Sequence, residues 1–186
     1  MLKNLYKVLL VVLLVGLFIA SSLYGCLDNN EQISSNSDFN DNLVAEYGEK
    51  NKINIIEKYS DNSYAILLYE NSTSYGIDFC EIEKNNKKLT KKSGYYWNKD
   101  KNSDFYAKCY SYNYEKEDIN VIILIFEDND LLKKTNTAEF NFEDLTLKSI
   151  IDQDNRAYLI RMSKAPKKLV LQSVSLFDEN GTLLNK

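Results

Sequence analysis

The chain has 186 residues, of which 44% are hydrophobic and 12% aromatic, and its formal net charge is −4. It contains no histidine, which excludes Ser-His-Asp and Cys-His catalysis and histidine-ligated zinc or haem. The negative charge disfavours nucleic acid as a partner, because phosphate backbones attract basic surfaces. We therefore expect one domain or two small ones with a packed core, and no cofactor, metal or nucleic-acid ligand.

The first 25 residues differ from the rest. Two lysines precede an apolar run over residues 8–20, and small residues follow, as in a secretory signal peptide. The border LYGC (residues 23–26) resembles the lipobox of prokaryotic lipoproteins, although Tyr24 stands where a small residue is usual. This resemblance implies a lipid on the sulfur of Cys26 and cleavage before it. The alternatives are an uncleaved membrane helix over residues 5–24 and plain secretion.

In each case we expect the following domain to face the extracytoplasmic side, because the lysines precede the apolar segment. A lipid on Cys26 or an uncleaved helix would also attach it to the cell membrane. A diacylated cysteine carries two chains, which makes lipid anchoring stable. Residues 26–45 are mostly polar and lack clear periodicity, so we predict a flexible tether that begins at the lipidated Cys26. Only residues 43–50 are compatible with one or two helical turns.

From residue 52 onward, short segments with alternating apolar residues are separated by clusters of Asn, Asp, Gly and Ser. This pattern predicts an all-β protein built as an antiparallel β-sandwich. The segment 119–127 is apolar on both faces, so we expect a central, fully covered strand. Asn180-Gly181 predicts a tight hairpin turn. The expected strands are 52–59, 64–70, 75–83, 89–97, 105–115, 119–127, 138–142, 145–151, 156–162 and 168–178.

We divide this β region into a first sheet region, 46–117, and a second, Ig-like sheet region, 118–186. The division is placed near Glu117 because the strand count after it suits a small sandwich. One continuous domain is equally allowed.

Two cysteines remain in the predicted domain, Cys80 and Cys109. Each lies in an expected strand, and Cys109 shares a face with Phe105 and Ala107, which predicts that it faces the core. Outside the cytoplasm the two cysteines are candidates for a disulfide. The alternative is a pair of buried, reduced cysteines that act as small apolar residues. A catalytic thiol is not expected, because no histidine can activate it.

Aromatic residues concentrate in two segments, YYW at 95–97 and YAKCYSYNY at 106–114. In the second segment, the tyrosines at even positions fall on one face together with Lys108. If this face is exposed, it forms an aromatic strip that can stack on sugar rings or contact a protein. If it is covered, it is one inner face of the sandwich. The candidate binding surface consists of Tyr95, Tyr96, Trp97, Tyr106, Tyr110, Tyr112 and Tyr114.

Acidic residues cluster at 127–130, 142–145 and 152–155, each time where a strand is expected to end. Paired carboxylates can hydrolyse a glycoside or hold calcium, but Asp and Asn are also the ordinary residues of turns. We assign no catalytic residue. The sequence favours a non-enzymatic binding or accessory module, with a protein or a cell-envelope glycan as its partner. The alternatives are a carboxylate-dependent hydrolase of envelope glycans and a structural spacer.

Overall fold

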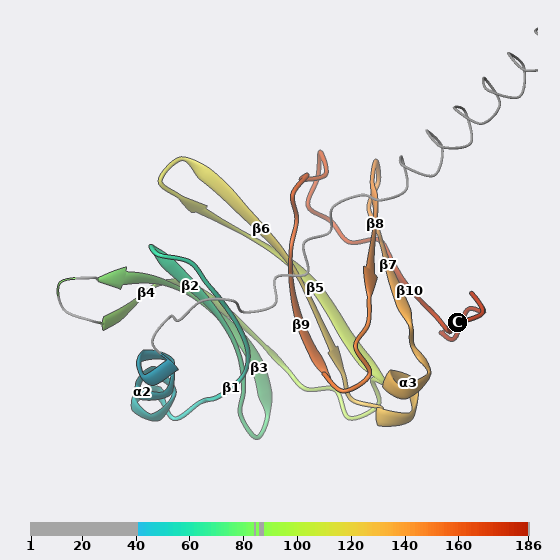
Figure 1. Cartoon of the computed structure of the whole chain (residues 1–186), viewed down its shortest axis with the longest axis horizontal. Helices are drawn as coiled ribbons and strands as arrows, with labels where there is room; N and C mark the ends of the chain where they lie inside the picture. Colours follow the sequence, from blue (N-terminus) through green and yellow to red (C-terminus); the bar gives the residue numbers. More distant parts are fainter. Residues whose placement is uncertain (1–40, 84, 86–87, 186) are drawn as a thin grey trace, which may run out of the picture.

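The computed structural model describes residues 41–83, 85 and 88–185, which form antiparallel strands and two short helices (Figure 1). The predicted all-β, antiparallel, sandwich-like fold is confirmed. The helices are α2 (Asp41–Asn51) and α3 (Asn129–Lys134). The strands are β1 (Asn54–Ser60), β2 (Tyr64–Glu70), β3 (Ser74–Glu83), β4 (Lys88–Asn98), β5 (Phe105–Tyr114), β6 (Glu117–Phe126), β7 (Thr137–Asn141), β8 (Thr146–Ile150), β9 (Ala157–Arg161) and β10 (Ser173–Phe177).

The predicted signal peptide, Cys26 and most of the predicted tether lie outside the described residues. Within the described part of the chain, no helix combines the length and the apolar character needed to cross a membrane. Helix α2 begins at Asp41, so the last residues of the predicted tether, 41–45, are helical. This helix includes the segment 43–50 that is compatible with helical turns, and it buries Val44 and Tyr47.

The strands form three antiparallel sheets that are stacked in layers (Figure 1). The first sheet has the order β1-β2-β3-β4, the middle sheet β5-β6-β9, and the third sheet β10-β7-β8. Apolar residues of the middle sheet pack against the first sheet on one face and against the third sheet on the other. The molecule therefore has two main hydrophobic cores, one on each face of the middle sheet.

Strand β6 lies at the centre of the middle sheet, between β5 and β9. Every residue from Ile119 to Phe126 is buried, which confirms the fully covered strand predicted from its apolar sequence. Alternate side chains enter the two cores, because successive residues of a strand point to opposite faces. Ile122 and Leu124 pack toward the third sheet, whereas Ile123 and Ile125 pack toward the first.

The sheets do not follow the division into regions 46–117 and 118–186. Strand β5, which we assigned to the first region, pairs with β6 from Phe105↔Phe126 to Tyr114↔Glu117. The proposed boundary therefore falls inside the β5–β6 hairpin, and the change of sheet comes earlier, between β4 and β5. Strands of the region 118–186 do form two facing sheets, but one of these, the middle sheet, also includes β5 from the first region as an edge strand.

Two hairpin turns use the left-handed backbone region differently. The β5–β6 turn has Glu115 at φ 47° and Lys116 at φ 75°, although neither is glycine. The predicted C-terminal turn has Gly181 at φ 78°, and an isolated bridge joins Phe177 to Leu183. The second turn agrees with its sequence signal, whereas the first had none.

Helix α3 replaces the simple turn expected after β6. The Asp128 side chain accepts hydrogen bonds from the N–H groups of Asp130 and Leu131, which caps the helix. Leu132 is buried in the core between the middle and third sheets. Lys133 and Lys134 lie in the last turn, where positive charge is favourable. Six residues are too few to show a helical period, so the sequence could have indicated this helix only through its N-cap residue.

Candidate functional site

The structure covers most of the predicted aromatic strip. Its four tyrosines on β5 are half-buried and pack into the core between the first and middle sheets. Tyr106 lies against Tyr75, and Tyr112 stacks on Phe79 with ring centroids 4.9 Å apart. These residues, with Tyr114, form an inner face of the sandwich, which was the alternative to an exposed strip. Cys109, as predicted, points to the opposite core with Phe105 and Ala107.

The aromatic rings of β4 remain accessible at the side of the sandwich. Tyr96 is 80% exposed and Tyr95 is 43% exposed. Tyr95 stacks on Tyr110 at 4.7 Å, and Trp97 stacks on Tyr110 at 5.9 Å. The ammonium group of Lys108 lies 5.9 Å from the Trp97 ring. We call Tyr95, Tyr96, Trp97 and Tyr110 the aromatic edge.

Tyr110 is half-buried and lies beneath two rings of the aromatic edge, those of Tyr95 and Trp97. Burial raises the pKa of its hydroxyl to about 12, so the group is neutral at physiological pH. The Nε1 atom of Trp97 is also buried, and no described residue accepts a hydrogen bond from it. The aromatic edge therefore offers flat aromatic rings, two of which are stacked on Tyr110.

Strand β4 is the outermost strand of the first sheet and pairs only with β3 among the described strands. Just beyond the strands, the N–H of Lys99 donates to the carbonyl of Thr73 at 2.9 Å. Hydrogen-bonded and non-bonded pairs alternate along an antiparallel ladder. The pair Tyr75↔Trp97 lies two residues further along the same register, so it is also a hydrogen-bonded pair.

By the same alternation, Gly94, Tyr96 and Asn98 occupy the non-bonded positions opposite β3. The β2–β3 pairing agrees, because the N–H of Asn71 donates to the carbonyl of Ser74 at 2.9 Å, which turns Gly76 toward β2. The backbone N–H and C=O groups of these three β4 residues therefore point away from the sheet. They form an open hydrogen-bonding edge next to the aromatic rings.

The two halves of β4 differ in chemistry. The first half carries Lys88, Lys91 and Lys92, and the register of pairing shifts there by one residue. Lysines and bulges are the usual devices that keep a sheet edge from pairing with another chain. The second half, residues 93–98, has the sequence SGYYWN, without charge. The second half therefore lacks the charges and the register shift that discourage pairing in the first half.

A second notable group lies on the outer face of the first sheet, beneath α2. Asp78 is 3% exposed, and it accepts a hydrogen bond from the Tyr47 hydroxyl at 2.8 Å. The Lys91 ammonium lies 2.6 Å from its other oxygen, and the Tyr69 hydroxyl lies 3.5 Å from the same oxygen. Burial and the bond to Asp78 raise the pKa of Tyr47, and burial raises that of Tyr69 to about 12.

Two glycines make room for this Asp78 cluster. A Cβ atom on Gly76 would meet the Tyr69 ring at 2.3 Å, and one on Gly94 would meet Asp78 at the same distance. Sequence reasoning missed the cluster, although an acidic residue within the apolar strand 75–83 was a visible signal. Because Tyr47 of α2 and Lys91 of β4 both bind this buried carboxylate, the cluster is suited to holding α2 against the sheet.

A groove of about 410 Å³ adjoins the Asp78 cluster, between α2 and the start of β4. Leu43 and Leu89 form its apolar walls, and Lys50 and Lys88 lie at its rim. Lys91 reaches from this groove to Asp78, so its charge is already partly neutralised.

The two cysteines do not form the disulfide that we considered from the sequence. Both are free thiols, and they lie in different cores. Cys80 packs with Val44 and Tyr47 under α2, whereas Cys109 faces the third sheet. Burial raises the pKa of each thiol to about 12, which makes both poor nucleophiles.

The three acidic clusters lie in separate connections between strands. Asp128 caps α3, and the Asp144 carboxylate accepts from the N–H of Lys167 at 3.2 Å. Asp152 accepts from the N–H of Asp154 at 3.1 Å. No group of three or more acidic or cysteine side chains within the described residues has metal-site geometry. In each cluster a carboxylate binds backbone N–H groups, as expected of turn residues.

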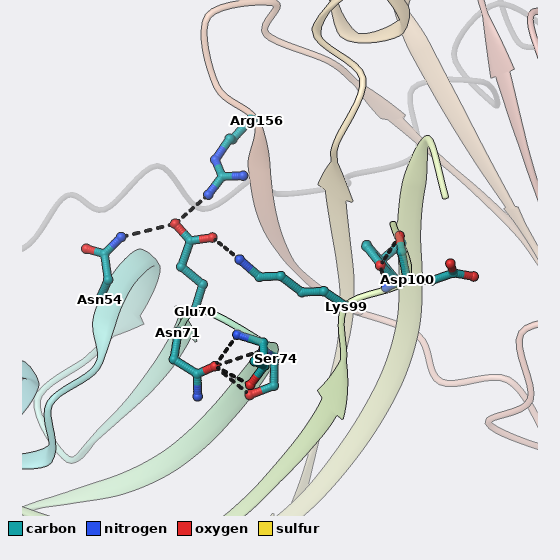
Figure 2. A network of polar contacts seen from close by, with 9 residues as sticks. Asn54, Glu70, Asn71, Ser74, Lys99, Asp100 and Arg156 are labelled. Carbon is teal, nitrogen blue, oxygen red and sulfur yellow. Dashed lines mark hydrogen bonds and ion pairs between the residues drawn. The ribbon is translucent and has the colours of Figure 1, made fainter. Parts of the chain in front are cut away.

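A further polar network joins the first and middle sheets at one end of the molecule (Figure 2). One Glu70 oxygen accepts from Arg156 at 2.6 Å and from Asn54 at 3.1 Å, and the other accepts from Lys99 at 2.9 Å. Lys99 also lies 4.5 Å from the centre of the Tyr75 ring. The network connects β1, β2 and the residue that follows β4 to the loop that precedes β9, so it ties the two sheets together.

The described residues therefore form a three-layered antiparallel β protein, and the aromatic edge includes three residues of β4, one of its edge strands. Comparison with protein-family models, with curated proteins and with solved structures finds no match to this chain.

Proposed function

We propose that this chain is a lipid-anchored, extracytoplasmic binding module without enzymatic activity, which takes up a polypeptide strand along the second half of β4. The leader supports the anchor and the orientation, because the border at residues 23–26 resembles a lipobox and follows a lysine-flanked apolar run. A lipid on Cys26 would hold the domain at the membrane surface, where a binding edge meets other envelope proteins.

The observation that carries the proposal is the open half of β4. Backbone groups of Gly94, Tyr96 and Asn98 point outward beside exposed rings, on a stretch without charge. Adding a strand to a sheet edge is a recurrent way to bind an extended peptide, in which the backbone supplies affinity and alternate side chains supply specificity. A polypeptide satisfies these outward backbone groups in a ladder, which a glycan does not, so the geometry favours a protein partner.

Site-specific photo-crosslinking in the membrane of the native host tests the binding edge. A benzoylphenylalanine in place of Tyr96 should form an adduct with a polypeptide, since this side chain is 80% exposed beside the open backbone. The matched control places the same group at Ile150, which is 71% exposed on β8 of the third sheet. Equal adducts at both positions, or none at Tyr96, would contradict the proposal.

The anchor is tested separately by the intact mass of the protein purified from the membrane fraction. Loss of residues 1–25 together with the added mass of acyl chains is expected. A full-length, unmodified mass would remove lipidation from the proposal and leave an uncleaved membrane helix as the means of attachment.

A further inference from the structure

We infer that the strand taken up at this edge is β4 of a second copy of the chain, paired antiparallel about a two-fold axis at Tyr96. The inference rests on the proposed function and names its partner. Such an interface is isologous, because the same patch serves both copies, and it joins two four-stranded first sheets into one continuous sheet.

The backbone pattern of β4 is self-complementary about Tyr96. With the axis there, Tyr96 exchanges both of its backbone hydrogen bonds with Tyr96 of the second copy. Gly94 then exchanges bonds with the second copy's Asn98, and Asn98 with the second copy's Gly94. All outward N–H and C=O groups of the uncharged half are satisfied in this single register.

Side chains support the same register. The two Tyr96 rings become a direct cross-strand pair on the outer face, and Tyr95 comes to lie opposite Trp97 of the second copy on the inner face. Directly opposed aromatic residues are among the stabilising pairs of antiparallel sheets. Tyr95 already stacks on Tyr110, so the second copy's Trp97 extends an existing row of rings.

Charge confines self-pairing to this half of the strand. An axis at Thr90 would place Lys88 of one copy opposite Lys92 of the other, and an axis at Lys91 would place the two Lys91 side chains opposite each other. Like charges in opposed positions are destabilising. The register shift next to Lys92 also interrupts the ladder there. Two copies tethered in one membrane plane meet at a raised effective concentration, which favours pairing over a short interface.

Disulfide trapping of the full chain in its membrane tests the register. Tyr96→Cys should give a covalent dimer under mild oxidation, because the two Cα atoms face each other within the range that a disulfide spans. Asn98→Cys should give little, since its two copies are about 14 Å apart along the strands. Ile150→Cys, exposed on the third sheet, and the unsubstituted chain are the controls.

Association is measured independently by the molar mass of the purified full chain in detergent. The unsubstituted chain should be dimeric, and Tyr96→Lys should weaken association about tenfold or more, because it places two ammonium groups at the axis. Ile150→Lys should leave the dimer intact. Tyr96 is exposed, so its replacement should not disturb the fold.

The outcomes separate this inference from the proposed function. A monomeric chain without Tyr96→Cys dimers, or dimers formed equally by Asn98→Cys, would overturn the inference. If Tyr96 then still crosslinks to another polypeptide, the binding edge stands with a different partner. If Tyr96 crosslinks to no polypeptide, both the inference and the proposed function fail.

Discussion

At the scale of single residues, two carboxylates of the first sheet show how position decides the role of a charge. Asp78 lies in the middle of β3 and is covered by Tyr47 of α2. Glu70 is the last residue of β2, and it forms ion pairs with Lys99, which follows β4, and with Arg156, which precedes β9 (Figure 2). One carboxylate holds a helix on the sheet, and the other holds two sheets together.

Tyr47→Phe should lower the free energy of unfolding by about 1–3 kcal/mol, because the buried Asp78 carboxylate loses a hydrogen-bond donor. Urea denaturation measures the change. Tyr96→Phe removes a hydroxyl from an exposed side chain and should have an effect within about 0.5 kcal/mol. Equal effects of the two substitutions would show that the Asp78 cluster does not stabilise the fold.

Glu70 should make stability depend on acid pH. Burial alone would raise its pKa, but hydrogen bonds and positive charge from Lys99 and Arg156 hold it below the ordinary value of 4.5. A lowered folded-state pKa stabilises the protein above the unfolded value, and this stabilisation is lost as pH falls through the folded pKa.

Glu70→Gln should therefore destabilise the protein at pH 7, by about 1–3 kcal/mol on the scale of charged hydrogen bonds. The difference from the unsubstituted chain should shrink as the pH falls below 4.5. Denaturation curves between neutral and acid pH measure it. Glu179→Gln, exposed in the C-terminal turn, should have little effect at pH 7. A difference that stays constant with pH would show that the charge of Glu70 is not involved.

At the scale of elements, the β5–β6 hairpin is the clearest conflict between local sequence and fold. Its two turn residues are held at positive φ without glycine or asparagine. A two-residue hairpin requires this geometry, and it costs an ordinary side chain about 1–2 kcal/mol. The long ladder from Phe105 to Phe126 imposes the turn, because shifting it would move every buried side chain to the wrong face.

Replacing Glu115-Lys116 by Asn-Gly should therefore raise the free energy of unfolding by about 1–2 kcal/mol. Thermal and urea denaturation both measure the gain. The reverse substitution, Gly181→Ala at φ 78° in the C-terminal turn, should lower stability by about 1 kcal/mol. If the Asn-Gly replacement left the free energy of unfolding unchanged or lowered it, contacts of the Glu115 or Lys116 side chain would be what stabilises the turn.

At the scale of the whole molecule, the middle sheet separates two cores, and this separation decides the state of the thiols. Cys80 lies under α2 on the far face of the first sheet, whereas Cys109 lies in the core against the third sheet. Two layers of backbone therefore stand between them.

Both thiols should stay reduced even in an oxidising compartment. The intact mass should not change on treatment with a reductant, and a thiol reagent should label Cys80 and Cys109 only after unfolding, because burial raises both pKa values to about 12. Labelling of the unfolded chain is the positive control. A mass increase on reduction would show a bridge and would require a different arrangement of the layers.

The sequence by itself determined the strands and the all-β class, because apolar alternation and turn residues act over a few neighbours. Strand β6 was recognisable as central, since a strand covered on both sides must be apolar on both sides. The face of β5 that carries Cys109 was equally readable from its period of two.

Only the tertiary structure decided which sheet each strand joins and which aromatic rings remain exposed. The β5 tyrosines and Tyr96 have the same local sequence character, but a facing sheet covers the former and nothing described covers the latter. Likewise, Asp78 finds its partner Tyr47 from a helix 31 residues earlier. Such pairings depend on contacts between distant segments, and the sequence pattern of one strand does not specify which segments lie beside it.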